Sequence, residues 1–118
     1  MKNQYPVKFV ARALIKNGRT LGYFPSMAFI KETLKEQDAE FETMHTKYHI
    51  EYCEKFDDDI IENYPYQTGY YYGKVFDDET ACQDYVDAIN KRLPFYNKAE
   101  LAALKALRSQ TANEPTTE

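Results

Sequence analysis

The chain has 118 residues, with fifteen Lys/Arg, nineteen Asp/Glu and a formal charge of −4 at neutral pH. Its two cysteines exclude a disulfide framework, and the sequence holds neither a signal segment nor an apolar run long enough to span a bilayer. We therefore expect a protein of the reducing cytoplasm with no membrane association. The length predicts one globular domain over residues 1–108, followed by a polar, disordered C-terminal tail over residues 109–118.

The charges are sorted along the chain. Residues 1–35 carry a net charge of +6, residues 36–90 a net charge of −12, and residues 91–118 a net charge of +2. An acidic middle segment attracts basic partners and repels phosphates. This pattern favours a basic protein partner and disfavours direct nucleic-acid binding.

Residues 5–24 have the pattern of a β-hairpin. Apolar residues at every second position from Val7 to Ile15 indicate a half-buried strand, and Asn17-Gly18 suits a type I′ turn. Lys8, Arg12 and Lys16 fall on the other, more polar face of this strand, together with Val10 and Leu14.

Pro25-Ser26 then predicts a break. Ser26 is a suitable N-cap for a helix to about Gln37, with Met27, Ile30 and Leu34 on one side.

Residues 42–56 fit a strand or a helix, and their Tyr, Thr, His and Ile content favours the strand. The choice decides whether His45, His49 and Cys53 form a metal site. On a helix the three side chains meet, whereas on a strand successive members stand about 13 Å apart. Preferring the strand, we expect no metal site.

The remaining elements follow in order. Residues 56–67 predict a connection, and residues 69–76 an aromatic strand. A helix capped by Asp77 or Asp78 extends to about Arg92, and a second begins at Asn97, with Glu100 in a capping box and Tyr96 stapled on Leu101. The predicted fold class is α+β, an antiparallel sheet of about four strands with three helices on one face, in the order β-β-α-β-β-α-α.

No pattern in the sequence names a reaction. The chain lacks a nucleophile elbow, a P-loop and a dinucleotide fingerprint. Residues 69–76 match the RNA-recognition motif poorly, since Thr68, Tyr71 and Gly73 stand where it needs other residue types. We expect no enzymatic activity and no cofactor.

Acids and tyrosines are interleaved between residues 57 and 79. Tyrosine beside carboxylate engages arginine-rich surfaces through cation–π contacts and charge-assisted hydrogen bonds. The predicted partner-binding residues are Asp57, Asp58, Asp59, Glu62, Tyr70, Tyr72, Asp77, Asp78 and Glu79.

In length, acidity and aromatic content the whole chain resembles phage-encoded inhibitor proteins, anti-CRISPR proteins among them. No motif carries the resemblance, and it transfers no functional residue. It implies a small protein-binding module that occupies the basic nucleic-acid-binding surface of its target. The alternatives are a structural or accessory subunit that forms homo-oligomers through its C-terminal helices and, third, a nucleic-acid-binding or metal-binding protein.

Overall fold

The computed structural model describes residues 5–38, 40, 43–56, 67–106 and 110–111. It begins with an antiparallel pair, β1 (Val7–Lys16) and β2 (Arg19–Asp38). Asn17 and Gly18, with φ of 55° and 72°, form the tight turn between them. The predicted hairpin is confirmed.

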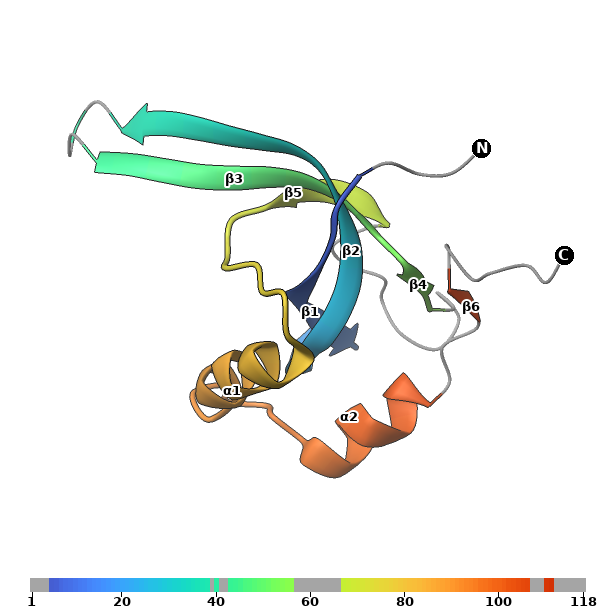
Figure 1. Cartoon of the computed structure of the whole chain (residues 1–118). Coiled ribbons are helices and arrows are strands. Elements are labelled where there is room, and N and C mark those ends of the chain that lie inside the picture. The colour runs from blue at the N-terminus through green and yellow to red at the C-terminus, as the bar shows by residue number, and fades with distance from the viewer. Residues whose placement is uncertain (1–4, 39, 41–42, 57–66, 107–109, 112–118) are drawn as a thin grey trace, which may run out of the picture.

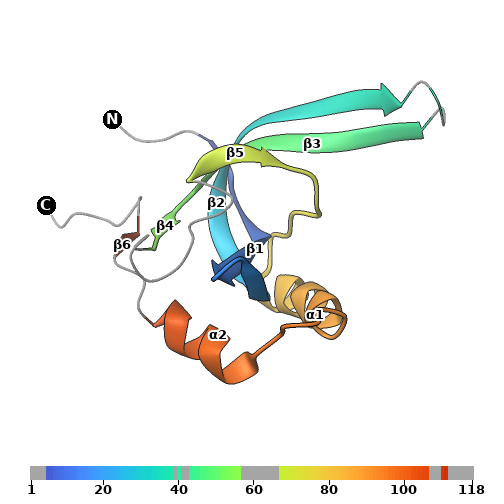
Figure 2. The ribbon, with the colours of Figure 1, turned by 180° about the vertical axis from the view of Figure 1, so that it is seen from behind.

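Strand β2 continues far beyond the predicted break (Figure 1). Its second half pairs with β3 (Thr43–Tyr52), and β3 pairs with the short β5 (Thr68–Tyr71), so the sheet order is β1-β2-β3-β5. The β2–β3 pair projects as an arm from the rest of the molecule (Figure 2). The preference for a strand in residues 42–56 is thus confirmed, although Glu54–Lys55 forms a separate strand, β4, which pairs with β6 (Gln110–Thr111).

The predicted helix from Ser26 to Gln37 is wrong. Ala28, Phe29 and Ile30 are all buried, which a strand achieves by packing on both faces. Pro25 lies opposite Ala11, and Tyr23 and Met27, two residues before and two residues after Pro25, direct backbone groups away from β1. The position where Pro25 lacks an N–H is therefore on the edge of β2 away from β1, before the residues that pair with β3. The β1–β2 ladder loses no hydrogen bond.

Two helices follow, α1 (Glu79–Asn90) and α2 (Lys98–Lys105), at the end of the molecule opposite the β2–β3 arm (Figure 1). Asp78 caps α1 by accepting from the Ala81 N–H, and Asn97 caps α2 by accepting from the Glu100 N–H. Both predicted caps are confirmed. The fold is mixed α+β with a four-stranded antiparallel sheet, but it has two helices where three were predicted, and the predicted order of elements is not matched.

The helices pack on opposite faces of the β1–β2 hairpin. Helix α1 buries Cys82 and Val86 against Ala11, with Tyr23 beside them, whereas Leu101 of α2 packs in a cluster with Leu14, Leu21, Phe24, Phe56 and Leu104. Tyr23 and Phe24 are neighbours in β2, and neighbours in a strand face opposite ways. The expectation that all helices cover one face is therefore wrong.

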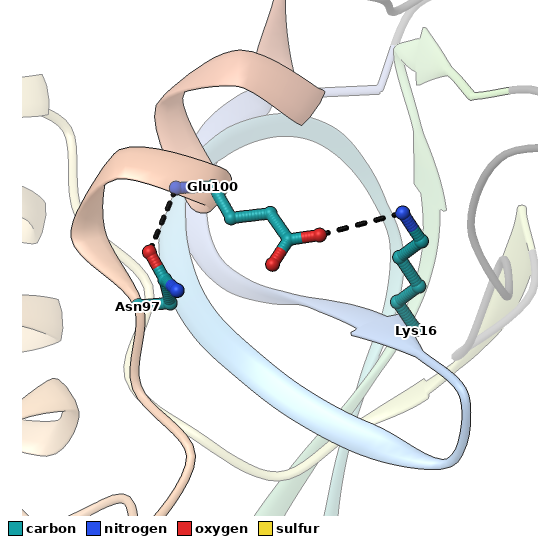
Figure 3. Close-up of polar contacts among 3 residues, drawn as sticks. All are labelled: Lys16, Asn97 and Glu100. Atoms are coloured by element: carbon teal, nitrogen blue, oxygen red, sulfur yellow. Dashed lines mark hydrogen bonds and ion pairs between the residues drawn. The ribbon is translucent and has the colours of Figure 1, made fainter.

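The first turn of α2 is tied to the end of β1. The Lys16 ammonium lies 3.4 Å from the Glu100 carboxylate (Figure 3). The backbone N–H of Glu100 donates to the Asn97 side chain over 2.9 Å. These polar contacts sit at the rim of the cluster around Leu101 and place α2 against the hairpin.

The side chain of Asn90, the last residue of α1, binds β2. Its amide accepts from the Tyr23 N–H over 2.7 Å and donates to the Tyr23 C=O over 3.1 Å. Further along, the Leu21 C=O accepts from the Asn97 N–H, and the Met27 C=O accepts from the Cys53 N–H. Groups distant in sequence thereby satisfy these backbone groups on the edge of β2 that β3 leaves open.

Candidate functional site

Two of the three described acids of the predicted site are engaged in contacts within the chain. Asp77 forms an ion pair with Lys8, Asp78 caps α1, and Glu79 stands exposed in the first turn. Asp57, Asp58, Asp59 and Glu62 lie outside the described residues, so their place relative to these three stays a prediction.

The two predicted tyrosines lie together on the surface. Tyr70 on β5 is 54% exposed and Tyr72, just beyond the strand, is 65% exposed. The Tyr70 ring stacks on His49 with centroids 5.3 Å apart, and the Lys47 ammonium lies 4.8 Å from the ring centroid. An ion pair of 2.5 Å with Glu36 raises the pKa of Lys47 by hydrogen bonding its charged form. The aromatic strand predicted over residues 69–76 corresponds to β5, which ends at Tyr71 and is shorter than predicted.

Both tyrosines line a cleft of about 400 Å³ between β1, α1 and the segment after β5. None of the lining side chains is formally charged, and six of them are tyrosines. Clefts of this size, apolar with a few polar groups, are typical of binding sites. The lining residues are Ala11, Ala13, Ile15, Thr20, Tyr23, Tyr52, Tyr70, Tyr71, Tyr72, Gly73, Tyr85 and Ile89.

Tyr71 holds the cleft open. Phe76 pairs with Phe9 through two backbone hydrogen bonds of 2.8 and 2.9 Å, so the chain after β5 starts a ladder on the outer edge of β1. At Ala11, the next residue of β1 that directs its backbone groups to this edge, the Tyr71 hydroxyl replaces the direct backbone bonds. It accepts from the Ala11 N–H over 3.2 Å and donates to the Lys74 C=O over 2.6 Å. The phenol therefore acts as a wedge between the two backbones.

Gly73 makes room for this wedge. A Cβ at Gly73 would lie 2.6 Å from the Tyr71 hydroxyl oxygen and 2.8 Å from its ring. Only glycine allows the phenol this approach, which accounts for the second glycine of the Gly-Tyr-Tyr-Tyr-Gly segment.

Tyr52 is a buried tyrosine in the cleft lining. Its side chain is 1% exposed, and its hydroxyl has no hydrogen-bond partner in the described part of the chain. The Arg12 guanidinium lies 4.0 Å from its ring centroid. Burial raises the pKa of Tyr52 to about 12, against the opposing charge of Arg12, so the phenol stays protonated at neutral pH.

The wall formed by α1 is acidic. Residues 77–90 contain five Asp/Glu and no Lys/Arg, and Tyr85 and Ile89 of this helix face the cleft. Asp84 and Asp87 are exposed, as is Glu79. An uncharged aromatic cleft thus has a negatively charged helix beside it.

The expected polar face of β1 is wrong at Arg12. This side chain is 1% exposed, donates to the Glu54 C=O over 2.7 Å and stacks on both Tyr52 and Phe56. Burial lowers the pKa of the Arg12 guanidinium from its very high ordinary value. Lys8 and Lys16 are paired with Asp77 and Glu100, so the hairpin presents no free basic triad.

The candidate metal-site residues are on β3, for His45 and His49, or directly after it, for Cys53, and they form no metal-binding group. Across the described ranges, no cluster of three or more His, Cys, Asp or Glu could hold a metal ion. Cys53 is fully buried, and burial raises its pKa to about 11. Cys82 behaves in the same way on α1.

Sequence reasoning missed most of the cleft. Tyr23, Tyr52, Tyr71 and Tyr85 come from four separate elements, and no local spacing connects them. One signal was present: Ala11 and Ala13 are small residues at alternate positions of a strand, which leaves space beside its edge.

Comparison with protein-family models, curated proteins and solved structures finds no match to this chain. Neither α1 nor α2 is long and apolar enough to cross a membrane, and the same holds for every helix within the described residues.

Proposed function

We propose that this chain is a non-enzymatic protein-binding module that holds a basic segment of a partner protein against its tyrosine-lined side. The observation that supports it is the pairing of exposed Tyr70 and Tyr72 with the cleft beside them. Tyrosine gives a large, rigid contact area with one polar group and is enriched at protein interfaces.

The charge around the cleft supports a basic partner. The acidic stretch over residues 77–90 attracts cations at long range, and tyrosine rings bind Lys and Arg at short range. A nucleic-acid-binding protein is the partner class we propose, because its basic surface already binds anions. Occupying that surface would make the chain an inhibitor.

Two observations favour this proposal over its alternatives. Leu101 and Leu104 of α2 are buried in the chain's own core, so they offer no apolar stripe for self-association. Arg12 of the hairpin is buried and Lys8 and Lys16 are paired, so three of its four basic side chains are unavailable for a phosphate-binding patch, and the exposed Arg19 lies over the Phe95 ring.

A pull-down of the intact protein from a lysate of its own organism, at low and high salt, tests the proposal. We expect a basic protein to be captured at low salt and released at high salt. The joint change Tyr70→Ala and Tyr72→Ala should reduce capture at least about tenfold, as loss of interface tyrosines does. Reversal of Asp57, Asp58 and Asp59 to Lys should abolish capture while leaving the melting temperature nearly unchanged.

The matched control is Glu40→Lys, a charge reversal of an exposed residue in the turn between β2 and β3, beyond the last paired residues Asp38 and Thr43. It should capture the partner as the wild type does. Capture that is insensitive to salt and to the tyrosine changes would contradict the proposal, and a concentration-independent dimer in light scattering would favour a structural role.

A further inference from the structure

The outer edge of β1 is a strand edge that is only partly occupied. Backbone groups of a strand alternate in direction, so Phe9, Ala11 and Ala13 all direct theirs away from β2. Those of Phe9 bind Phe76, and the N–H of Ala11 binds the Tyr71 hydroxyl. No described residue supplies a hydrogen bond to the outward N–H and C=O of Ala13.

The unoccupied part of this edge is also a wall of the tyrosine-lined cleft. Ala11, Ala13 and Ile15 line it from β1, and Tyr72 and Gly73 line it from the segment opposite. The Tyr71 wedge keeps that segment from continuing its ladder past Phe76. The result is a gap beside two unpaired backbone groups, with small side chains on the strand.

A second polar group lacks a partner in the same cleft. Tyr52 lines the cleft, and its hydroxyl, which is buried, has no hydrogen-bond partner among the described residues. A buried hydroxyl without a hydrogen bond is costly, so a ligand whose entry exposes this hydroxyl and supplies a hydrogen bond to it gains affinity. Its protonated state at neutral pH makes it both a donor and an acceptor.

We infer that the cleft binds an extended peptide segment of the partner, which adds as a strand to the outer edge of β1 at Ala13. Main-chain bonds to Ala13 provide affinity, and one side chain enters the cleft between Tyr71, Tyr72 and Tyr85. Lys or Arg residues of the peptide lie beside the acidic α1, whose charge they complement. This inference deepens the proposed function and depends on it.

The experiment uses the full chain and a phage-displayed library of random nonapeptides as the probe. We expect selection of segments with alternating β-branched or aromatic residues and with basic residues. Each selected peptide is then resynthesised with single N-methyl groups along its backbone. Methylation should weaken binding at least about tenfold at every second position of the peptide and have little effect at the positions in between. The reason is that only alternate N–H groups of a strand face the neighbouring strand.

Two protein variants locate the site. Ala13→Pro removes an outward N–H without breaking the β1–β2 ladder, and it should abolish peptide binding. Tyr52→Phe removes only the unpartnered hydroxyl and should weaken binding about fivefold, the equivalent of one hydrogen bond. Tyr96→Phe, which removes a hydroxyl outside this cleft, is the matched control and should bind like the wild type.

The outcomes separate this inference from the proposed function. Equal tolerance of N-methylation at all positions would overturn strand addition even if Ala13→Pro failed to fold, since that measurement uses the wild-type protein. A library that yields no binder, beside a lysate partner whose capture depends on Tyr70 and Tyr72, would overturn strand addition and leave the proposed function standing. Failure of both experiments would overturn both.

Discussion

Asn90 makes the sharpest prediction about what holds this fold together. Its buried side chain accepts from the Tyr23 N–H and donates to the Tyr23 C=O, joining the end of α1 to the unpaired edge of β2. The change Asn90→Ala removes both hydrogen-bonding groups of this side chain, so the Tyr23 N–H and the Tyr23 C=O both lose their partner. Each backbone group left unsatisfied costs about 1–3 kcal/mol, and the helix propensity gained with alanine returns about 0.5 kcal/mol.

We therefore expect Asn90→Ala to lower the free energy of unfolding by about 1.5–5.5 kcal/mol, which for a chain of this size is a fall in melting temperature of roughly 6–22 °C. Urea denaturation with an unchanged slope is the assay, because an unchanged slope shows that the compactness of the two states is retained. Asn97→Ala, which removes the exposed cap of α2, is the control and should cost about 1 kcal/mol.

Asn90→Asp separates the two hydrogen bonds. A carboxylate still accepts from the Tyr23 N–H but has no proton to donate to the Tyr23 C=O. We expect this variant to be destabilised at pH 7 and to recover part of its deficit relative to the wild type as acid protonates it. A loss below about 0.5 kcal/mol in Asn90→Ala, a typical surface effect, would refute the view that this amide completes the strand edge.

Two further predictions concern the wedge and the buried thiols. Gly73→Ala should lower stability by about 1–3 kcal/mol in thermal unfolding, since its Cβ displaces the Tyr71 phenol, whereas Gly69→Ala, with open space around it, should be nearly neutral; equal effects would contradict the wedge. Burial raises the pKa of both Cys53 and Cys82 to about 11, so the folded state keeps protons that the unfolded state loses from about pH 9. Stability should therefore fall as pH rises between about 9 and 11. The slope should be smaller in the double variant Cys53→Ala and Cys82→Ala, and an identical slope would show that the thiols do not cause it.

The hairpin, the two caps and the strand preference in residues 42–56 were predictable because each depends on residues adjacent in sequence. Asn17-Gly18 adopts positive φ at low cost, and Asp78 and Asn97 bind N–H groups three residues ahead. The same local reasoning failed for residues 26–37. Pro25-Ser26 is a helix-start signal, but here β3 supplies a ladder along β2, and both faces of the strand are buried from Ala28 to Ile30.

The candidate site divides in the same way. Tyr70 and Tyr72 were predicted as contact residues from their neighbours in sequence, and both are exposed beside the cleft. The cleft itself was not predictable. It depends on Tyr71 reaching Ala11, sixty residues away, and on Tyr52 and Tyr85 arriving from other elements.

The sequence by itself determined the turn, the caps, the acidic charge of residues 77–90 and the alternation that makes β1 a strand, since all of these arise from groups within a few residues of one another. The tertiary structure alone decided that Arg12 is buried against Tyr52, that Asp77 is paired with Lys8, and that Asn90 and Tyr71 complete or interrupt strand edges. These contacts join residues 40 to 69 positions apart. Their formation depends on packing of the whole chain, which short-range propensity does not encode.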